Sequence, residues 1–162
     1  HSTLTEYKAV LEPELYNRLF KFAVIRNPWD MMISWYFSPH RGVKEWRRKD
    51  FIDLIYEVPT LKHYVDLSCS PEEQSTRFET IFAVWSNLRK HLLHRHLNFL
   101  IRFESLNKDF QKVCKKIDIS FEPLPVRNKS EREPYSKYYD DELKEMVASK
   151  FKAEITCGGY RF

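Results

Sequence analysis

The sequence predicts an α/β fold in which a short parallel sheet is flanked by helices. Two short, mostly apolar and β-prone runs, residues 20–25 and 97–103, are each followed by a segment with helical spacing. Helices that alternate with short apolar strands are typical of α/β folds with a parallel sheet. The chain has 162 residues, of which 43% are hydrophobic and 31% charged, so we expect one domain spanning residues 1–162 with a buried core.

Two helix signals precede the first strand. Thr3 and Glu6 have the spacing of a capping box, which predicts a helix that begins at Leu4. Pro13 is predicted to open a short helical turn that ends at Leu19, because proline suits the first position of a helix.

The first predicted strand, residues 20–25, runs directly into a third helix signal. Asn27 is a good N-cap, Pro28 suits the first helical position, and Asp30 is favoured in the first turn. These residues predict a helix that runs from Pro28 to about Phe37.

The spacing of apolar residues predicts further helices in the rest of the chain. Their ranges are 50–58, 76–93, 106–117 and 138–155, with another helix start at 70–73. Residues 59–70 are predicted to be irregular, and 118–134 to form a loop rich in proline and charge. Two or three strands make a thin sheet for this number of helices, so we expect a further N-terminal strand upstream of His1.

The glycine and hydropathy patterns exclude several kinds of site. The three glycines are Gly42, Gly158 and Gly159, and their spacing excludes a dinucleotide fingerprint and a Walker A loop within these residues. Phosphate must therefore be held by side chains and helix N-termini. No apolar run approaches the length of a membrane span, so none is expected in this chain.

The cysteines suit a reducing compartment. Cys69, Cys114 and Cys157 lie far apart in the sequence and include no CxxC pair. Free thiols favour the cytoplasm; the alternative is a single disulfide with one thiol left over.

The strongest site signal lies at the carboxyl end of the first strand. Arg26 leaves this strand at the edge where open α/β sheets bind ligands, and Ser34 lies about two turns into the next helix. A guanidinium binds phosphate through two parallel N–H groups, and a hydroxyl can donate to a third oxygen. The spacing predicts a phosphate site. The alternative is that Arg26 pairs with an acid and Ser34 is an ordinary surface hydroxyl.

The run FAVIRNPWDMMISWYF, residues 22–37, resembles the 3′-phosphate-binding segment of the sulfotransferases that use 3′-phosphoadenosine 5′-phosphosulfate (PAPS). The resemblance is strongest to the carbohydrate-type and related bacterial group. It continues through NFLIRFESLNKDF, residues 98–110, and LPVRNKSEREPYSKYYDDEL, residues 124–143. The resemblance implies a P-loop-NTPase-like sulfotransferase fold in which Arg26 and Ser34 hold the 3′-phosphate of PAPS and of its product PAP.

The resemblance also implies a part that this sequence lacks. Family members open with a strand and a loop, usually with a Lys followed by small and hydroxyl residues, which binds the 5′-phosphosulfate. No segment here matches that loop. We expect it upstream of His1, in a longer parent of which this chain is an N-terminally incomplete piece.

A second group of candidate residues lies in the predicted loop ahead of the last helix. A basic loop with a hydroxyl can close over a nucleotide diphosphate and neutralise its charge. The resemblance implies that Arg127, Lys129 and Ser130 cover the bound nucleotide in this way. The alternative is a solvated basic loop balanced by Glu131 and Glu133.

His1 is the candidate catalytic residue. Parts of the resembling family have a His after the second strand that acts as general base on the acceptor hydroxyl, and His1 falls at that place. A neutral imidazole near pH 7 suits removal of a hydroxyl proton. The alternative is a terminal His without a catalytic role.

Other polar groups favour structural interpretations. His91, His94 and His96 have no Cys or acid to complete a metal site, so no metal is expected. For Glu104, a structural hydrogen bond to the backbone or to a neighbouring Arg is favoured over catalysis. The basic stretch at residues 41–49 is favoured as a solvated face over a surface for a sulfated or acidic acceptor.

The predicted function is transfer of a sulfuryl group from PAPS to an acceptor hydroxyl, such as one on a carbohydrate, by in-line displacement without a metal. The alternative is a non-enzymatic, basic nucleic-acid-binding module, favoured by a net charge of +4, a pI near 8.9 and 15% aromatic residues. The 23 interspersed acidic residues and the lack of an RNA-binding motif argue against it, so no nucleic-acid partner is expected. The resemblance leaves the Golgi lumen open beside the cytoplasm, since many carbohydrate sulfotransferases work there.

Overall fold

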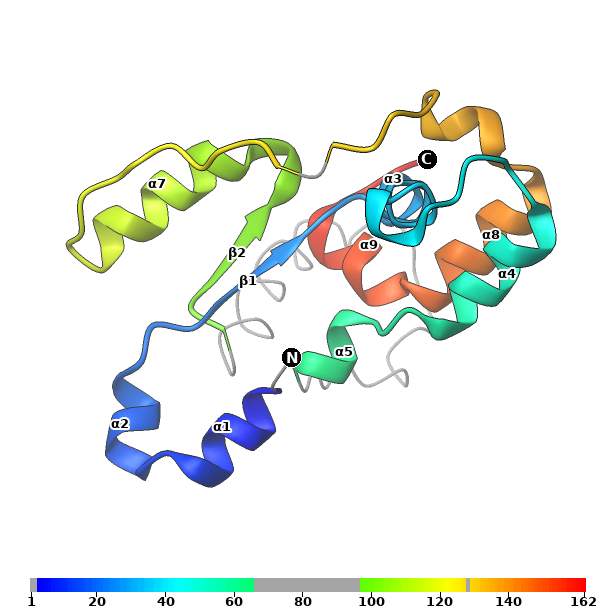
Figure 1. Ribbon diagram of the computed structural model, residues 1–162. Coiled ribbons are helices and arrows are strands. Elements are labelled where there is room, and N and C mark those ends of the chain that lie inside the picture. The colour runs from blue at the N-terminus through cyan, green and yellow to red at the C-terminus, as the bar shows by residue number, and fades with distance from the viewer. Residues whose placement is uncertain (1–2, 66–96, 128) are drawn as a thin grey trace, which may run out of the picture.

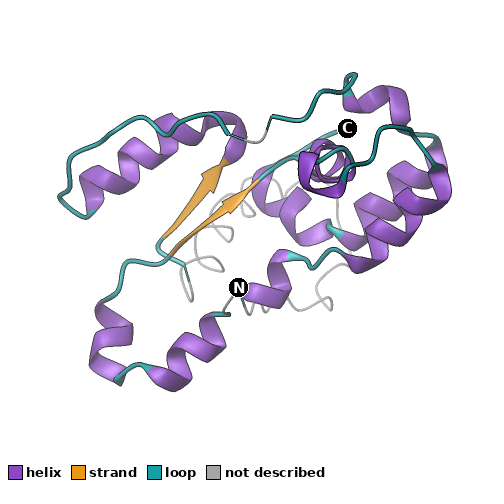
Figure 2. Cartoon of the chain, in the orientation of Figure 1, coloured by secondary structure: helices purple, strands orange, loops and turns teal. Residues whose placement is uncertain are grey.

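A computed structural model describes residues 3–65, 97–127 and 129–162 (Figure 1). This part of the chain is a mixed structure in which helices flank a small parallel sheet of two strands, which confirms the predicted α/β class (Figure 2). The helices are α1 (Leu4–Val10), α2 (Pro13–Arg18), α3 (Pro28–Tyr36), α4 (Arg48–Glu57), α5 (Leu61–Tyr64), α7 (Leu106–Lys116), α8 (Asp141–Lys150) and α9 (Lys152–Gly158). The strands are β1 (Phe22–Ile25) and β2 (Phe99–Arg102), and the short 3-10 turns are η1 (Pro39–Arg41), η3 (Phe103–Ser105) and η4 (Tyr135–Tyr138). No helix in these ranges is long and apolar enough to cross a membrane.

The two predicted strands pair with each other in parallel. Phe22 of β1 lies opposite Phe99 of β2, and Ile25 lies opposite Arg102. Because the strands are parallel, the residues that follow Ile25 and Arg102 emerge at the same edge of the sheet. Segments far apart in the sequence therefore meet there.

The first two helices begin where the sequence predicts. The Thr3 hydroxyl accepts a hydrogen bond from the Glu6 N–H at 3.2 Å, and the Glu6 carboxylate accepts one from the Thr3 N–H at 2.6 Å. This reciprocal pair is the predicted capping box at the start of α1. Pro13 opens α2, and neither helix contains a fully buried residue.

Helix α3 begins directly after β1, as predicted. The Asn27 side-chain oxygen accepts hydrogen bonds from the N–H groups of Trp29, at 3.0 Å, and Asp30, at 3.4 Å. Pro28 occupies the first helical position, where its missing N–H costs no hydrogen bond. The helix ends at Tyr36, one residue before the predicted end.

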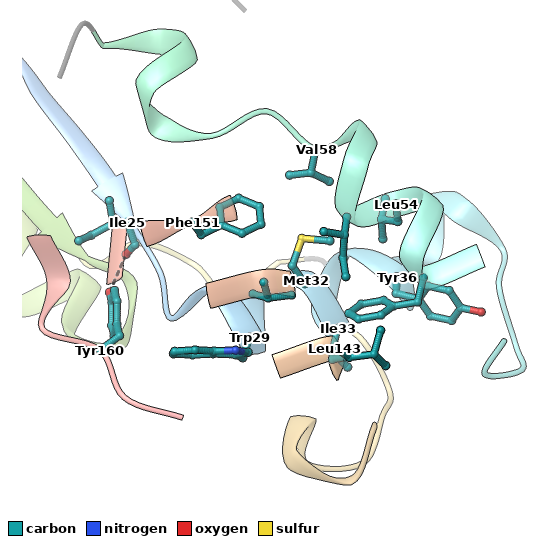
Figure 3. Close-up of a cluster of buried hydrophobic side chains, with 13 residues drawn as sticks. Ile25, Trp29, Met32, Ile33, Tyr36, Leu54, Val58, Leu143, Phe151 and Tyr160 are labelled. Carbon is teal, nitrogen blue, oxygen red and sulfur yellow. Dashed lines mark hydrogen bonds between the residues drawn. The ribbon is translucent and has the colours of Figure 1, made fainter. Parts of the chain in front are cut away.

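The main core lies where α3 packs against α4 and α8. The buried residues of α3 recur at helical spacing and form one apolar stripe: Trp29, Met32, Ile33 and Tyr36. Figure 3 shows this stripe against the side chains that face it, among them Leu54, Val58, Leu143 and Phe151. This packing holds the helix that begins at the edge of the sheet.

Two predictions about helices are wrong. Residues 61–64 were expected to be irregular but form α5, at whose start the Glu154 carboxylate accepts a hydrogen bond from the Leu61 N–H. A partner so distant in the sequence leaves no local signal. The single helix predicted over 138–155 is instead two helices, α8 and α9. Helix α8 begins after Asp140, whose side chain accepts a hydrogen bond from the Leu143 N–H at 2.8 Å. It ends at the buried Phe151, whose backbone leaves helical geometry at φ −101°, ψ 28°. The helices predicted at 70–73 and 76–93 lie outside the described residues.

Replacing Ile33 by Ala should lower the free energy of unfolding by about 2–5 kcal/mol, since it deletes buried methyl groups and leaves a cavity in the core. Denaturant unfolding measures this change. The matched control is Val10→Ala at a position 83% exposed, where the change should stay within about 0.5 kcal/mol. Equal losses in the two variants would contradict the packing of α3 described above.

Candidate functional site

Arg26 and Ser34 come together at the edge of the sheet, as the sequence predicts. Arg26 follows the last residue of β1, and Ser34 lies at the end of the second turn of α3. The Arg26 Nη1 donates a hydrogen bond to the Ser34 hydroxyl oxygen at 3.2 Å. The strand, the capped turn and the helix thus bring the Arg26 guanidinium and the Ser34 hydroxyl together near the start of α3.

Arg26 also pairs with an acid, as the alternative interpretation expected. Its Nε and Nη2 donate to the same oxygen of Asp30, Oδ2, at 2.8 and 2.5 Å. The two side chains are 21% and 26% exposed, so the pair is only partly open to solvent. Since Asp30 lies in the first turn of α3, this contact fixes one edge of the guanidinium against the helix.

Phe103 covers one face of the same guanidinium. The central carbon of the Arg26 guanidinium lies 4.4 Å from the centroid of the Phe103 ring, within the range of a cation–π contact. Phe103 follows the last residue of β2, so the parallel pairing of the strands brings it to Arg26.

The contacts of Arg26 leave part of its hydrogen-bonding capacity unused. A guanidinium has five N–H groups, and three are directed to Asp30 and Ser34 within the described residues. Two N–H groups therefore remain, one on each terminal nitrogen. They can donate to the oxygens of a phosphate or carboxylate.

Asp30 is shared with a second arginine. Its other oxygen, Oδ1, accepts a hydrogen bond from Arg132 Nη2 at 2.5 Å, and the Arg132 side chain is only 11% exposed. Two positive side chains therefore share one negative side chain, which leaves the cluster with a net positive charge. A partly buried site with this charge favours an anionic ligand.

The three candidates in the loop before α8 differ in their surroundings. Ser130 is half-buried, and its hydroxyl accepts a hydrogen bond from Arg132 Nε at 3.2 Å. This bond links Ser130, through Arg132 and Asp30, to Arg26. Arg127 and Lys129 are exposed, and the side chain of neither forms an ion pair with a described residue. His1 lies outside the described residues.

A carboxylate and a tyrosine hold the turn between β1 and α3. Glu104 Oε1 accepts a hydrogen bond from the Asn27 N–H at 2.7 Å, which is the structural role favoured for it. Its Oε2 accepts one from the Tyr160 hydroxyl at 2.8 Å, and the same hydroxyl lies 3.3 Å from the Ile25 carbonyl (Figure 3). Burial, and then the bond to Glu104, raise the pKa of the Tyr160 phenol.

A second tyrosine, in the segment between η4 and α8, holds the first turn of α3. The Tyr139 hydroxyl donates to the Trp29 carbonyl at 3.0 Å. Burial, together with the negative charge of Asp30, raises the pKa of the Tyr139 phenol, whereas Arg132 acts in the opposite direction. The start of α3 is thus connected to η3, directly after β2, to the C-terminal segment and to the segment that precedes α8.

Sequence reasoning missed four residues of this arrangement: Asp30, Phe103, Arg132 and Tyr160. Asp30 could have been recognised, because it lies four residues after Arg26 and pairs at this spacing are common around helices. The other three reach the site from distant parts of the chain and carry no local signal.

No group of three or more His, Cys, Asp or Glu side chains suited to a metal ion occurs among the described residues. The His91, His94 and His96 cluster lies outside them. A surface hollow lies between the C-terminal half of α7 and residues 118–121, and it contains none of the candidate site residues.

A scan against known protein families, a search of curated proteins and a search of solved structures each found no match. A functional proposal for this chain therefore rests on the geometry of its own residues and on the resemblance of its segments.

Replacing Gly158 by Ala should disrupt the contact between Tyr160 and Glu104. A Cβ atom at Gly158 would lie 2.1 Å from the Tyr160 ring, so the ring must move. We expect a loss of unfolding free energy of about 1–3 kcal/mol, typical of overpacking. Tyr160→Phe keeps the ring and removes only the hydroxyl, so denaturant unfolding should show a smaller loss for it; the reverse order would contradict the described position of the ring.

The raised pKa of Tyr139 predicts a dependence of stability on high pH. The phenol ionises near pH 10 in the unfolded chain but only above that in the folded chain, so its contribution is complete below pH 10 and is lost as the pH rises further. In Tyr139→Phe, unfolding free energies measured from pH 8 to 11 should fall less steeply than in the parent chain. Tyr56→Phe, at a position 72% exposed, is the matched control and should keep the parent slope.

Proposed function

We propose that this chain is the 3′-phosphate-binding part of a PAPS-dependent sulfotransferase with a P-loop-NTPase-like fold. The observation that carries the proposal is the Arg26 guanidinium beside the Ser34 hydroxyl, at the carboxyl end of a parallel strand. Two N–H groups of this guanidinium have no partner among the described residues. The resemblance of residues 22–37 to the 3′-phosphate segment of that family supports the same two residues.

The donors match the oxygens of a phosphate monoester. The two N–H groups of Arg26 that have no partner among the described residues donate to phosphate oxygens. The Ser34 oxygen accepts from Arg26, which leaves its own O–H group to donate to a third oxygen. The net positive charge that Arg26, Asp30 and Arg132 leave together suits a dianion better than a neutral ligand.

In the proposed reaction, the acceptor oxygen attacks the sulfur atom of PAPS while the bond from sulfur to the 5′-phosphate oxygen breaks, and PAP leaves. The anchored 3′-phosphate positions the nucleotide so that the acceptor, sulfur and leaving oxygen lie in line. His1 takes the proton of the acceptor hydroxyl, and the charge on the leaving phosphate needs cations nearby. Arg127, Lys129 and Ser130 supply charge and a hydroxyl when their loop covers the nucleotide.

The proposed acceptor is a hydroxyl group such as one on a carbohydrate. Neutralisation of the leaving phosphate by cationic side chains requires no metal.

Calorimetric titration tests the donor site with adenosine 3′,5′-bisphosphate and AMP. The bisphosphate should bind more tightly than AMP, and Arg26→Gln should weaken its binding about ten- to a hundredfold while leaving AMP binding unchanged. Ser34→Ala should weaken it by a smaller factor, about two- to tenfold. Arg47→Gln is the matched control, because it removes the same charge from a side chain that is 69% exposed and pairs only at 3.8 Å with Glu45.

Two results would contradict the sulfotransferase proposal. One is equal affinity for the bisphosphate and AMP in the parent chain. The other is preferential binding of long single strands with a steep salt dependence, which would favour the alternative of a nucleic-acid-binding module.

A further inference from the structure

We propose that Asp30 is a positioning residue that couples the segment 129–133 to the phosphate site. This inference rests on the proposed function, since it concerns how the same site holds its anion. The juxtaposition that carries it is one carboxylate between two arginines, one at the end of β1 and the other in the segment that precedes α8.

Both oxygens of Asp30 are committed, each to a different arginine. Oδ2 accepts from two nitrogens of Arg26 and so fixes the rotation of its guanidinium. Oδ1 accepts from Arg132, which is 102 residues away in the sequence. A displacement of either arginine therefore changes the contacts of the carboxylate that orients the other.

Arg132 in turn holds its own segment. Its Nε donates to the Ser130 hydroxyl at 3.2 Å, and its Nη1 donates to the Glu133 carbonyl at 3.4 Å. The Glu133 N–H donates to the Tyr138 hydroxyl at 3.1 Å, which ties the end of the segment to η4. The position of Ser130 and of the backbone around it therefore depends on where Asp30 holds Arg132.

Burial makes these contacts stronger than ordinary surface pairs. The side chains of Arg26, Asp30 and Arg132 are 21%, 26% and 11% exposed, so solvent and salt screen their charges less than on an open surface. Removing the central carboxylate would leave two partly buried arginines facing each other without a counter-charge.

The sign of the coupling follows from the charges. A dianion bound to Arg26 attracts the positive charge of Arg132 toward the site. It therefore favours the arrangement in which Asp30 holds Arg132. Binding of the anion should therefore order residues 129–133. By thermodynamic reciprocity, loosening this segment should weaken binding of the anion.

The variant Asp30→Asn distinguishes a positioning role of Asp30 from the effect of its negative charge on a bound anion. If Asp30 acted only as a nearby negative charge, its neutralisation would strengthen binding of an anion. If it positions the two arginines, neutralisation should instead weaken the binding of adenosine 3′,5′-bisphosphate, by about tenfold. The same titration distinguishes the two roles by the direction of the change.

Hydrogen exchange measured by mass spectrometry follows the segment itself. Without nucleotide, the amides of residues 129–133 should exchange several-fold faster in Asp30→Asn and in Arg132→Gln than in the parent chain. In the parent chain the bisphosphate should slow them, and in the two variants it should not. Arg48→Gln is the matched control, since it removes an arginine that pairs with Asp140 and Glu142 at a more open site, 43% exposed.

The outcomes separate the inference from the proposed function. If the parent chain does not bind the bisphosphate, the proposed function fails and the coupling to nucleotide fails with it, whatever the exchange rates are. If the parent chain binds the bisphosphate but Asp30→Asn binds it more tightly, or residues 129–133 exchange alike in all variants, the proposed function stands and the coupling is overturned. The coupling is supported if Asp30→Asn and Arg132→Gln both bind the bisphosphate more weakly and both exchange faster at residues 129–133. Arg48→Gln should change neither the binding nor the exchange.

Discussion

The turn at Asn27 is the constraint on which the arrangement of the site depends. Its backbone N–H is bound by Glu104 from the end of β2, while its side chain caps the first turn of α3. One residue thus joins the sheet to the main helix of the core. Because the turn is held from both sides, Arg26, which immediately precedes it, leaves the sheet in a defined direction. The Tyr160 hydroxyl, bound to the same glutamate, extends this anchor to the C-terminal segment.

The charges around Arg26 follow from this geometry. Helix α3 places Asp30 at the edge of the guanidinium that carries Nε and Nη2, and Ser34 at Nη1. The turn η3, directly after β2, places Phe103 on its face. An arginine restrained in this way loses little conformational entropy when it binds an anion, which is the physical advantage of preorganisation. The second arginine of the cluster, Arg132, adds the charge that makes an anion, rather than a neutral molecule, the favoured ligand.

The features that could be predicted from the sequence are those encoded by neighbouring residues. The capping box of α1, the N-cap at Asn27 and the meeting of Arg26 with Ser34 each involve residues at most eight positions apart. Contacts between distant segments could not be predicted in the same way. The start of α5 depends on Glu154, the end of α8 on the burial of Phe151, and the fixing of Asp30 on Arg132, and none of these partners has a spacing that reveals the contact.

A crystal structure of the chain with adenosine 3′,5′-bisphosphate would show which atoms contact the 3′-phosphate. We expect one phosphate oxygen within hydrogen-bond distance of each terminal nitrogen of Arg26, and a third oxygen at the Ser34 hydroxyl. The bond between Arg26 and Asp30 should remain in place. A nucleotide bound with its 3′-phosphate away from Arg26 would show that Arg26 is not the phosphate ligand. An Arg26 that leaves Asp30 to reach the phosphate would show that Asp30 does not position it.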